Sequence, residues 1–181
     1  ERTVGRILAR QADRLADKNF IETTSGDCIS YRDMHLRSNQ FAQDAAAFGI
    51  ESQEPVLVML PDTIDYVTVW CGLAKRGAIE VPINLAYRKS ILKRLCNDST
   101  AKRIIIDCQY VERLEEIADD LEHLDCVILY AEDQKLDSYG TLPPKLAQTY
   151  QVAGFEDLFS DISTDFEPAP QFSDLVGIMY T

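Results

Sequence analysis

Apolar runs of strand length alternate with longer stretches of helical periodicity along most of the chain. Residues 56–60 (VLVML) form an uninterrupted apolar run that stops at Pro61, which predicts a buried strand. Residues 64–74 are apolar on almost every side, which predicts a helix that is buried over most of its circumference. A second short strand is expected at residues 78–81, ending at Pro82. Strand, helix and strand in this order predict a parallel crossover unit, whose sheet needs cover on both faces.

The ends of this central helix carry their own signals. Asp62 is the expected N-cap, and Lys75 with Arg76 in the last turn would complement the helix dipole. Gly77 follows as the expected left-handed cap. Trp70 lies at helical spacing on the apolar helix and is predicted to be a core residue.

The same patterns predict most of the other elements. In the first third of the chain these are a helix capped by Thr3 over residues 4–15, a hairpin of residues 20–24 and 28–31, and a helix that starts at Ser30 and stops at Gly49. After the loop 85–88 we expect a helix with Ile91, Leu92, Leu95 and Cys96 facing inward, and then strands at 103–107 and 126–130 around a helix at 110–121. The last part should contain a short helix near 155–159 and an apolar strand at 175–181. Strands that alternate with helices at this spacing predict an α/β fold, with a mostly parallel sheet flanked by helices. We expect residues 1–130 to form this α/β layer, and residues 131–181 to form an acidic, proline-containing connection and the last strand.

Composition narrows the possible functions. The chain has 181 residues and a net charge of −12, which argues against binding to nucleic acid or to an anionic membrane surface. No apolar run approaches the roughly 20 residues that a membrane span needs. The first residue is Glu1 rather than methionine, and we expect a trimmed chain.

The cysteines and histidines offer no obvious site. The five cysteines have no close pair, which favours buried, reduced thiols in a cytoplasmic protein over a zinc site or a disulfide scaffold. His35 and His123 have no serine, cysteine or carboxylate at a spacing typical of a triad, so both are interpreted as ordinary helix or surface residues. We therefore assign no catalytic residue and no metal ligand in this chain.

Three stretches resemble one enzyme superfamily. Residues 72–84 (GLAKRGAIEVPIN) resemble the segment G-x-x-K-x-G-A-x-x-V-P-x-N of the acyl-CoA synthetase, peptide-synthetase adenylation and luciferase superfamily. Residues 29–34 (ISYRDM) are similar to its [TS]-Y-x-E-L signature, with Asp33 and Met34 in place of Glu and Leu. Residues 175–181 resemble the strand that ends in Y-T and runs into the phosphate loop S-G-T-T-G-x-x-K-G. The resemblance extends over essentially the whole chain and the first third of a full-length member.

The resemblance implies the N-terminal part of an adenylate-forming enzyme. Such a parent would be an ATP-dependent acyl-CoA ligase that uses Mg²⁺, activates a carboxylate as an acyl-adenylate and transfers it to coenzyme A. Thr181 would be the first hydroxyl of the ATP phosphate loop, and Arg88 would meet a phosphate of coenzyme A. The catalytic residues would lie in the rest of the parent chain, so we expect this fragment to be inactive. Within the superfamily, the chain resembles small- and medium-chain acyl-CoA ligases, including crotonobetaine/carnitine-CoA ligase.

Other interpretations stay open at this point. The loop before Arg88 is longer than the N-x-R-L variant of the superfamily, so Arg88 could equally be a solvated cation before a helix. A non-catalytic α/β interaction module is an alternative for the whole chain. A Rossmann-like oxidoreductase is disfavoured because no strand is followed by G-x-G-x-x-G.

Overall fold

The computed structural model describes residues 2–131, 143–159 and 170–180. The chain divides into two compact units that interleave along the sequence: unit 1 comprises Glu1–Glu54, Asp62–Ile79 and Leu158–Val176, and unit 2 comprises Pro55–Pro61, Glu80–Asp157 and Gly177–Thr181. The predicted domains 1–130 and 131–181 stay a prediction, because residues 132–142 and 160–169 lie outside the described ranges.

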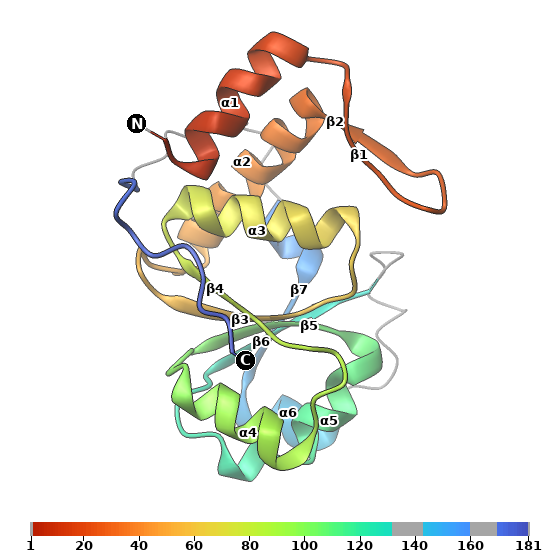
Figure 1. Cartoon of the computed structure of the whole chain (residues 1–181). Coiled ribbons are helices and arrows are strands. Elements are labelled where there is room, and N and C mark those ends of the chain that lie inside the picture. The colour runs from red at the N-terminus through yellow and green to blue at the C-terminus, as the bar shows by residue number, and fades with distance from the viewer. Residues whose placement is uncertain (1, 132–142, 160–169, 181) are drawn as a thin grey trace. The chain divides into compact units, whose positions relative to one another are not determined.

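Unit 1 is built from three helices and a hairpin. The helices are α1 (Val4–Leu15), α2 (Tyr31–Ala47) and α3 (Ile64–Arg76), and the antiparallel hairpin joins β1 (Asn19–Glu22) to β2 (Cys28–Ser30) (Figure 1). The sequence predicted all five elements to within a few residues.

Side-chain caps define where these helices begin. Thr3 Oγ1 accepts a hydrogen bond from Arg6 N at 3.4 Å, and Ser30 Oγ accepts one from Asp33 N at 3.0 Å, as predicted. The cap of α3 is Thr63, whose Oγ1 accepts from Tyr66 N at 3.2 Å. The prediction of Asp62 as the cap was therefore wrong by one residue, because the hydroxyl of Thr63 accepts the hydrogen bond from the backbone N–H three residues on.

The interior of unit 1 is less uniform than the apolar pattern suggested. Leu8, Met34 and Cys71 are buried in its core. Trp70 packs against this core but is only half-buried, so its predicted full burial was wrong. Ile7 was predicted on the apolar face of α1 but is 40% exposed.

Unit 2 contains a five-stranded sheet in the order β4-β3-β5-β6-β7. Its strands are β3 (Pro55–Met59), β4 (Ile79–Pro82), β5 (Arg103–Asp107), β6 (Cys126–Tyr130) and β7 (Gln151–Gly154). The pairs β3/β5, β5/β6 and β6/β7 are parallel. The predicted α/β fold with a mostly parallel sheet is confirmed.

Three helices pack on one face of this sheet. They are α4 (Lys89–Asp98), α5 (Val111–Glu115) and α6 (Pro144–Thr149). Their buried side chains form one core with alternate strand residues, and this core includes Leu57, Met59, Leu92, Leu95, Ile104, Ile106, Leu114, Val127, Leu129 and Leu146. None of the helices in the described ranges is long and apolar enough to span a membrane.

Several predicted elements of unit 2 need correction. The helix expected at 110–121 is not continuous. It is replaced by a 3₁₀ turn η1 (Cys108–Tyr110), the short helix α5 of five residues, and a second 3₁₀ turn η2 (Ala118–Asp120). The connection predicted after residue 130 contains α6 and β7 before the short η4 (Phe155–Phe159), which was expected as a helix. Pro144 lies in the first turn of α6, where a proline favours helix initiation.

The last described residues do not form the predicted strand. Gly177 makes one isolated parallel bridge to Glu80, and Ile178 N donates to Glu80 O at 2.9 Å. Met179 is 80% exposed, although the apolar pattern predicted burial. Ile91 of α4 is likewise 53% exposed rather than inward-facing.

Candidate functional site

The candidate site lies in unit 2, where the loop after β4 meets the segment after β5. In open α/β sheets, ligands collect beyond the carboxyl ends of the strands. β4 ends at Pro82 and leads through Ile83 into the loop 84–88, and β5 ends at the buried Asp107. Asp107 Oδ1 accepts a hydrogen bond from Gln109 N at 2.9 Å, which starts the 3₁₀ turn η1.

Local hydrogen bonds fix the conformation of the loop. Asn84 Oδ1 accepts from Ala86 N at 2.8 Å, and Asn84 O accepts from Tyr87 N at 2.9 Å. Asparagine is favoured in such turns because its side chain bonds its own backbone two residues on. The loop is therefore a defined turn rather than a loose linker.

Arg113 of α5 ties this turn to the segment after β5. Its Nη1 donates to Leu85 O, and its guanidinium lies 4.5 Å from the centre of the Tyr110 ring. Such a cation–π contact orients the planar guanidinium. No sequence signal marks Arg113, because it lies inside a segment predicted to be one continuous helix and belongs to no motif.

Arg88 follows the turn directly and precedes α4. Its backbone is extended (φ −148°, ψ 161°), and its side chain makes no capping hydrogen bond. Lys89, the next residue, has φ +50°, a left-handed conformation that is uncommon for a residue with a side chain. Arg88 is exposed at this sharp change of direction, as both interpretations of the residue expected.

A hollow of about 440 Å³ adjoins the start of α4. It is lined by Tyr87, Ser90, Ile91, Arg94, Leu95 and Tyr180. Burial raises the pKa of Tyr180, with the hydrogen bond and the charge of Asp98 acting in the same direction and Arg94 opposing them. The structure thus brings Tyr180 beside the residues that follow Arg88, although Arg88 itself does not line the hollow. Thr181 lies outside the described residues, so its predicted place is untested.

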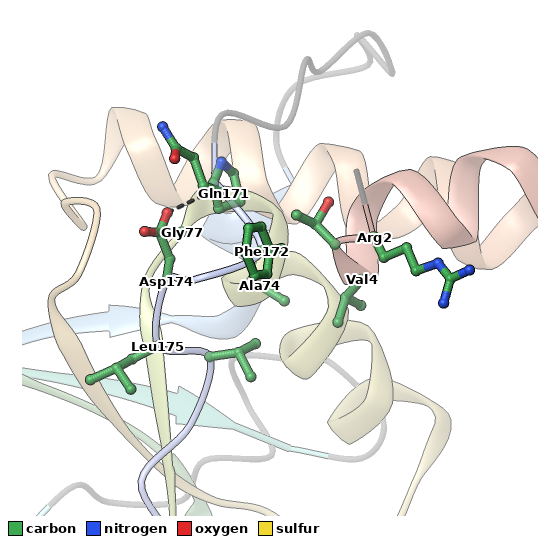
Figure 2. Close-up of a pocket in the computed structure, with 11 residues that line it drawn as sticks. Arg2, Val4, Ala74, Gly77, Gln171, Phe172, Asp174 and Leu175 are labelled. Carbon is green, nitrogen blue, oxygen red and sulfur yellow. Dashed lines mark hydrogen bonds between the residues drawn. The ribbon is translucent and has the colours of Figure 1, made fainter.

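A second, smaller cavity lies in unit 1 (Figure 2). It has a volume of about 110 Å³ and is lined by Arg2 and Val4 at the start of α1, Ala74 and Gly77 at the end of α3, and the segment 170–176. Gln171 N donates to Asp174 Oδ2 at 2.7 Å and closes a turn in that segment. The cavity has room for a few water molecules rather than for a substrate.

The described residues contain no group of three or more His, Cys, Asp or Glu side chains that could hold a metal ion. None of the five cysteines forms a disulfide, and Cys71, Cys96 and Cys126 are buried. Cys28 is exposed and Cys108 is half-buried, so the predicted burial holds for three of the five. The structure offers no metal centre in the part of the chain that it describes.

Residues 8–181 match the family described as AMP-binding enzyme. A long-chain-fatty-acid–CoA ligase of Escherichia coli O157:H7 is 28% identical over 136 residues, which are 75% of this chain and 23% of that protein. The 4-coumarate–CoA ligase 1 of Petroselinum crispum is 26% identical over 106 residues, 58% of this chain and 20% of that protein. The chain therefore matches about a quarter of the length of these relatives.

Solved structures show the same fold. A long-chain-fatty-acid-CoA ligase from Archaeoglobus fulgidus superposes with a TM-score of 0.78 at 20% identity, covering 99% of this chain and 34% of that one. An anthranilate CoA ligase in complex with anthranoyl-AMP gives a TM-score of 0.75 at 23% identity, covering 93% of this chain and 30% of that one. From the match over residues 8–181, the chain belongs to the AMP-binding enzyme family.

Proposed function

We propose that the chain is the N-terminal part of an ATP-dependent, AMP-forming acyl-CoA ligase. The observation that carries this proposal is the family match, which extends over residues 8–181. The names of the relatives support it, because several are CoA ligases. The match favours neither a Rossmann-like oxidoreductase nor a non-catalytic interaction module.

The proposed reaction has two halves. A carboxylate attacks the α-phosphate of ATP, giving an acyl-adenylate and pyrophosphate. The thiol of coenzyme A then attacks the acyl carbon, giving a thioester and AMP. Both halves depend on positioning highly charged phosphates, which is the task of cations and backbone donors.

Arg88 is the proposed contact for a phosphate of coenzyme A. Three observations support this role: the residue is exposed, it follows a turn held by Asn84 and Arg113, and it precedes α4 in an extended conformation. A guanidinium pairs with phosphate through two parallel N–H bonds, so a defined starting point for the side chain improves its fit.

Thr181 remains the proposed first hydroxyl of the ATP phosphate loop. The preceding residue, Tyr180, packs against the core of unit 2, and this contact supports the proposal by fixing the position of the chain at residue 180. We also propose that the parent uses Mg²⁺, although the described residues contain no group of three or more His, Cys, Asp or Glu side chains that could hold a metal ion.

The acid that the parent activates is proposed from the resemblance alone. A small or medium acid such as crotonobetaine or carnitine is the first candidate. The relatives are named for long-chain fatty acids and for 4-coumarate, so those acids are the natural alternatives. We also propose a cytoplasmic location, which five cysteines without a disulfide among them support.

The rest of the parent chain is the proposed partner of an apolar surface in unit 1. Phe172, Leu175 and Val176 are 77%, 58% and 40% exposed, and Figure 2 shows Phe172 and Leu175 along the segment 170–176. Contiguous exposed apolar side chains typically mark an interaction site. The relatives are about four times longer than their matched part, which supplies an occupant of suitable chemistry within the same polypeptide.

The test uses the parent protein and a panel of acids. Pyrophosphate exchange would report adenylate formation, and thioester formation would report the second half. We expect exchange with at least one of crotonobetaine, carnitine, a long-chain fatty acid or 4-coumarate. Hydride transfer from a nicotinamide cofactor without any exchange would reject the ligase in favour of the oxidoreductase.

A further inference from the structure

Lys75 is a fully buried amine in the middle of unit 1. Its side chain extends from α3 towards α2, where Nζ lies 2.6 Å from Asn39 Oδ1, 2.7 Å from Ser38 Oγ, 2.9 Å from His35 O and 3.2 Å from His35 Nδ1. None of these four atoms carries a negative charge. The charged form of a buried amine is normally stabilised by an anion, so this environment is unusual.

The neighbouring hydrogen bonds restrict the protons on His35. Ser38 Oγ donates to Met34 O at 2.6 Å, so it is available to accept from Lys75. Asn39 presents its Oδ1 to Lys75, which leaves its Nδ2 facing His35 Nε2 at 3.4 Å. An amide Nδ2 can only donate, so His35 Nε2 accepts this hydrogen bond and therefore holds no proton.

A doubly protonated ring does not fit this arrangement. An imidazolium has N–H groups at both nitrogens, and it would face the Nδ2 donor on one side and the amine of Lys75 on the other. Two cations 3.2 Å apart in a buried site repel strongly. The closed packing of α2 on α3 therefore requires a neutral His35.

The electrostatics agree with this geometry. Burial, followed by the charge of Lys75, lowers the pKa of His35 to about 4, and Asp13 of α1 opposes the shift. Burial lowers the pKa of Lys75 to about 7, and Cys71, one turn earlier on α3, opposes it. Asp13 and Cys71 are thus the titratable groups of the packed helices that act on the pair.

We infer that His35 and Lys75 form a proton-sensitive contact between α2 and α3, and that acidification opens the packing of these two helices within unit 1. This property goes beyond the proposed ligase reaction and does not depend on it. In the open state the imidazole would titrate near the ordinary value of about 6.5. Between about pH 6.5 and 4, protonation of His35 in the open state makes opening about tenfold more favourable for each unit by which the pH falls.

Amide hydrogen exchange of the 181-residue chain tests the inference. Peptides from α2 and α3 would be compared with peptides from β5 and β6 at pH 6.5, 5.5 and 4.5, after correction for intrinsic exchange rates. In the wild type, protection of α2 and α3 should fall by about tenfold per pH unit relative to the strands. In His35→Gln this relative loss should disappear.

His123→Gln is the matched control, since His123 is the other histidine of the chain and is exposed. In this variant, the protection of α2 and α3 relative to the strands should fall with pH as it does in the wild type. The same relative loss in His35→Gln and in the wild type would overturn the inference, as would its disappearance in His123→Gln.

A second measurement needs no variant. Nuclear magnetic resonance of the imidazole protons in the wild type should show His35 titrating well below pH 6, together with shifts of α2 and α3 amides at the same midpoint. Titration of His35 near 6.5, or titration without those amide shifts, would overturn the inference.

Discussion

Gly72 of α3 leaves the space that the ring of Phe41 of α2 occupies. A Cβ placed on Gly72 would lie 2.3 Å from Phe41 Cδ1 and 2.8 Å from Phe41 Cγ, far inside van der Waals contact. Phe41 is completely buried, so its ring has little freedom to move. The close packing of Phe41 therefore explains why the segment 72–84 begins with a glycine.

Gly72→Ala should destabilise the protein despite the better helix propensity of alanine. Overpacking of a core costs about 1–3 kcal/mol, and the propensity gain returns about 1 kcal/mol at most, so a net loss is expected. Urea unfolding measures it. In a Phe41→Leu background the same change should cost less, because the two sites share one space. An unchanged loss in that background would reject the explanation.

Gly77→Val should lower the free energy of unfolding by about 1 kcal/mol or more. Gly77 has φ +80°, as the helix ending predicted, and a Cβ there would lie 2.8 Å from Ser52 Oγ. In a Ser52→Ala background, Gly77→Val should lose the part of its cost that comes from the clash with Ser52 Oγ. The part that comes from the unfavourable positive φ should remain. Equal melting temperatures of the wild type and Gly77→Val would contradict this account.

The stability of the chain should rise with pH above neutrality because of Lys75. The unfolded lysine binds its proton up to about pH 10.5, whereas the folded one loses it near pH 7. Between these values the unfolded state holds more protons, so raising the pH favours folding. Lys75→Met removes the titrating group. The gain in unfolding free energy from pH 7 to 9 should therefore be smaller in the variant, and an equal gain would show that Lys75 does not titrate there.

Much of the fold could be predicted from the sequence, because it rests on local patterns. The apolar run at 56–60, the helix over 64–74 and the glycine at 77 are short-range signals, and the structure confirms each of them. Arg103–Asp107 and Cys126–Tyr130 were likewise predicted to the residue. The parallel pairing of these strands could be predicted because the strands alternate with helices along the chain.

The failures have a common physical cause, since they depend on tertiary contacts. Lys75 was expected only to complement the dipole of its helix, yet it is buried against neutral acceptors of α2 that lie 36–40 residues away in sequence. Arg113 has the pattern of an ordinary helix residue in the sequence, and only the fold brings it to the carbonyl of Leu85, to which it donates a hydrogen bond. Residues 175–180 read as a strand, but only Gly177 pairs, and it does so through a single bridge.

The role of Arg88 is best tested in the parent enzyme. If its guanidinium meets a phosphate of coenzyme A, Arg88→Ala should weaken thioester formation and leave pyrophosphate exchange unchanged. Arg94→Ala, which removes a cation of α4 from the nearby hollow, serves as a comparison. An equal loss in both half-reactions, or a loss in neither, would reject the role of Arg88.

We propose that this chain supplies only part of an adenylate-forming site. The stretch 88–94 contains the exposed cations Arg88 and Lys89 but no glycine. We therefore propose that the rest of the parent chain is needed to hold the α-phosphate of ATP in line with a carboxylate, since positioning accounts for much of the catalysis.

Pyrophosphate exchange with the purified 181-residue chain and with its parent, on the same panel of acids, tests this claim most directly. We predict exchange by the parent and none by the chain, and a Ser/Thr/Gly-rich loop containing a lysine soon after Thr181 in the parent. Exchange by the chain alone, or a parent that exchanges with no acid, would contradict it.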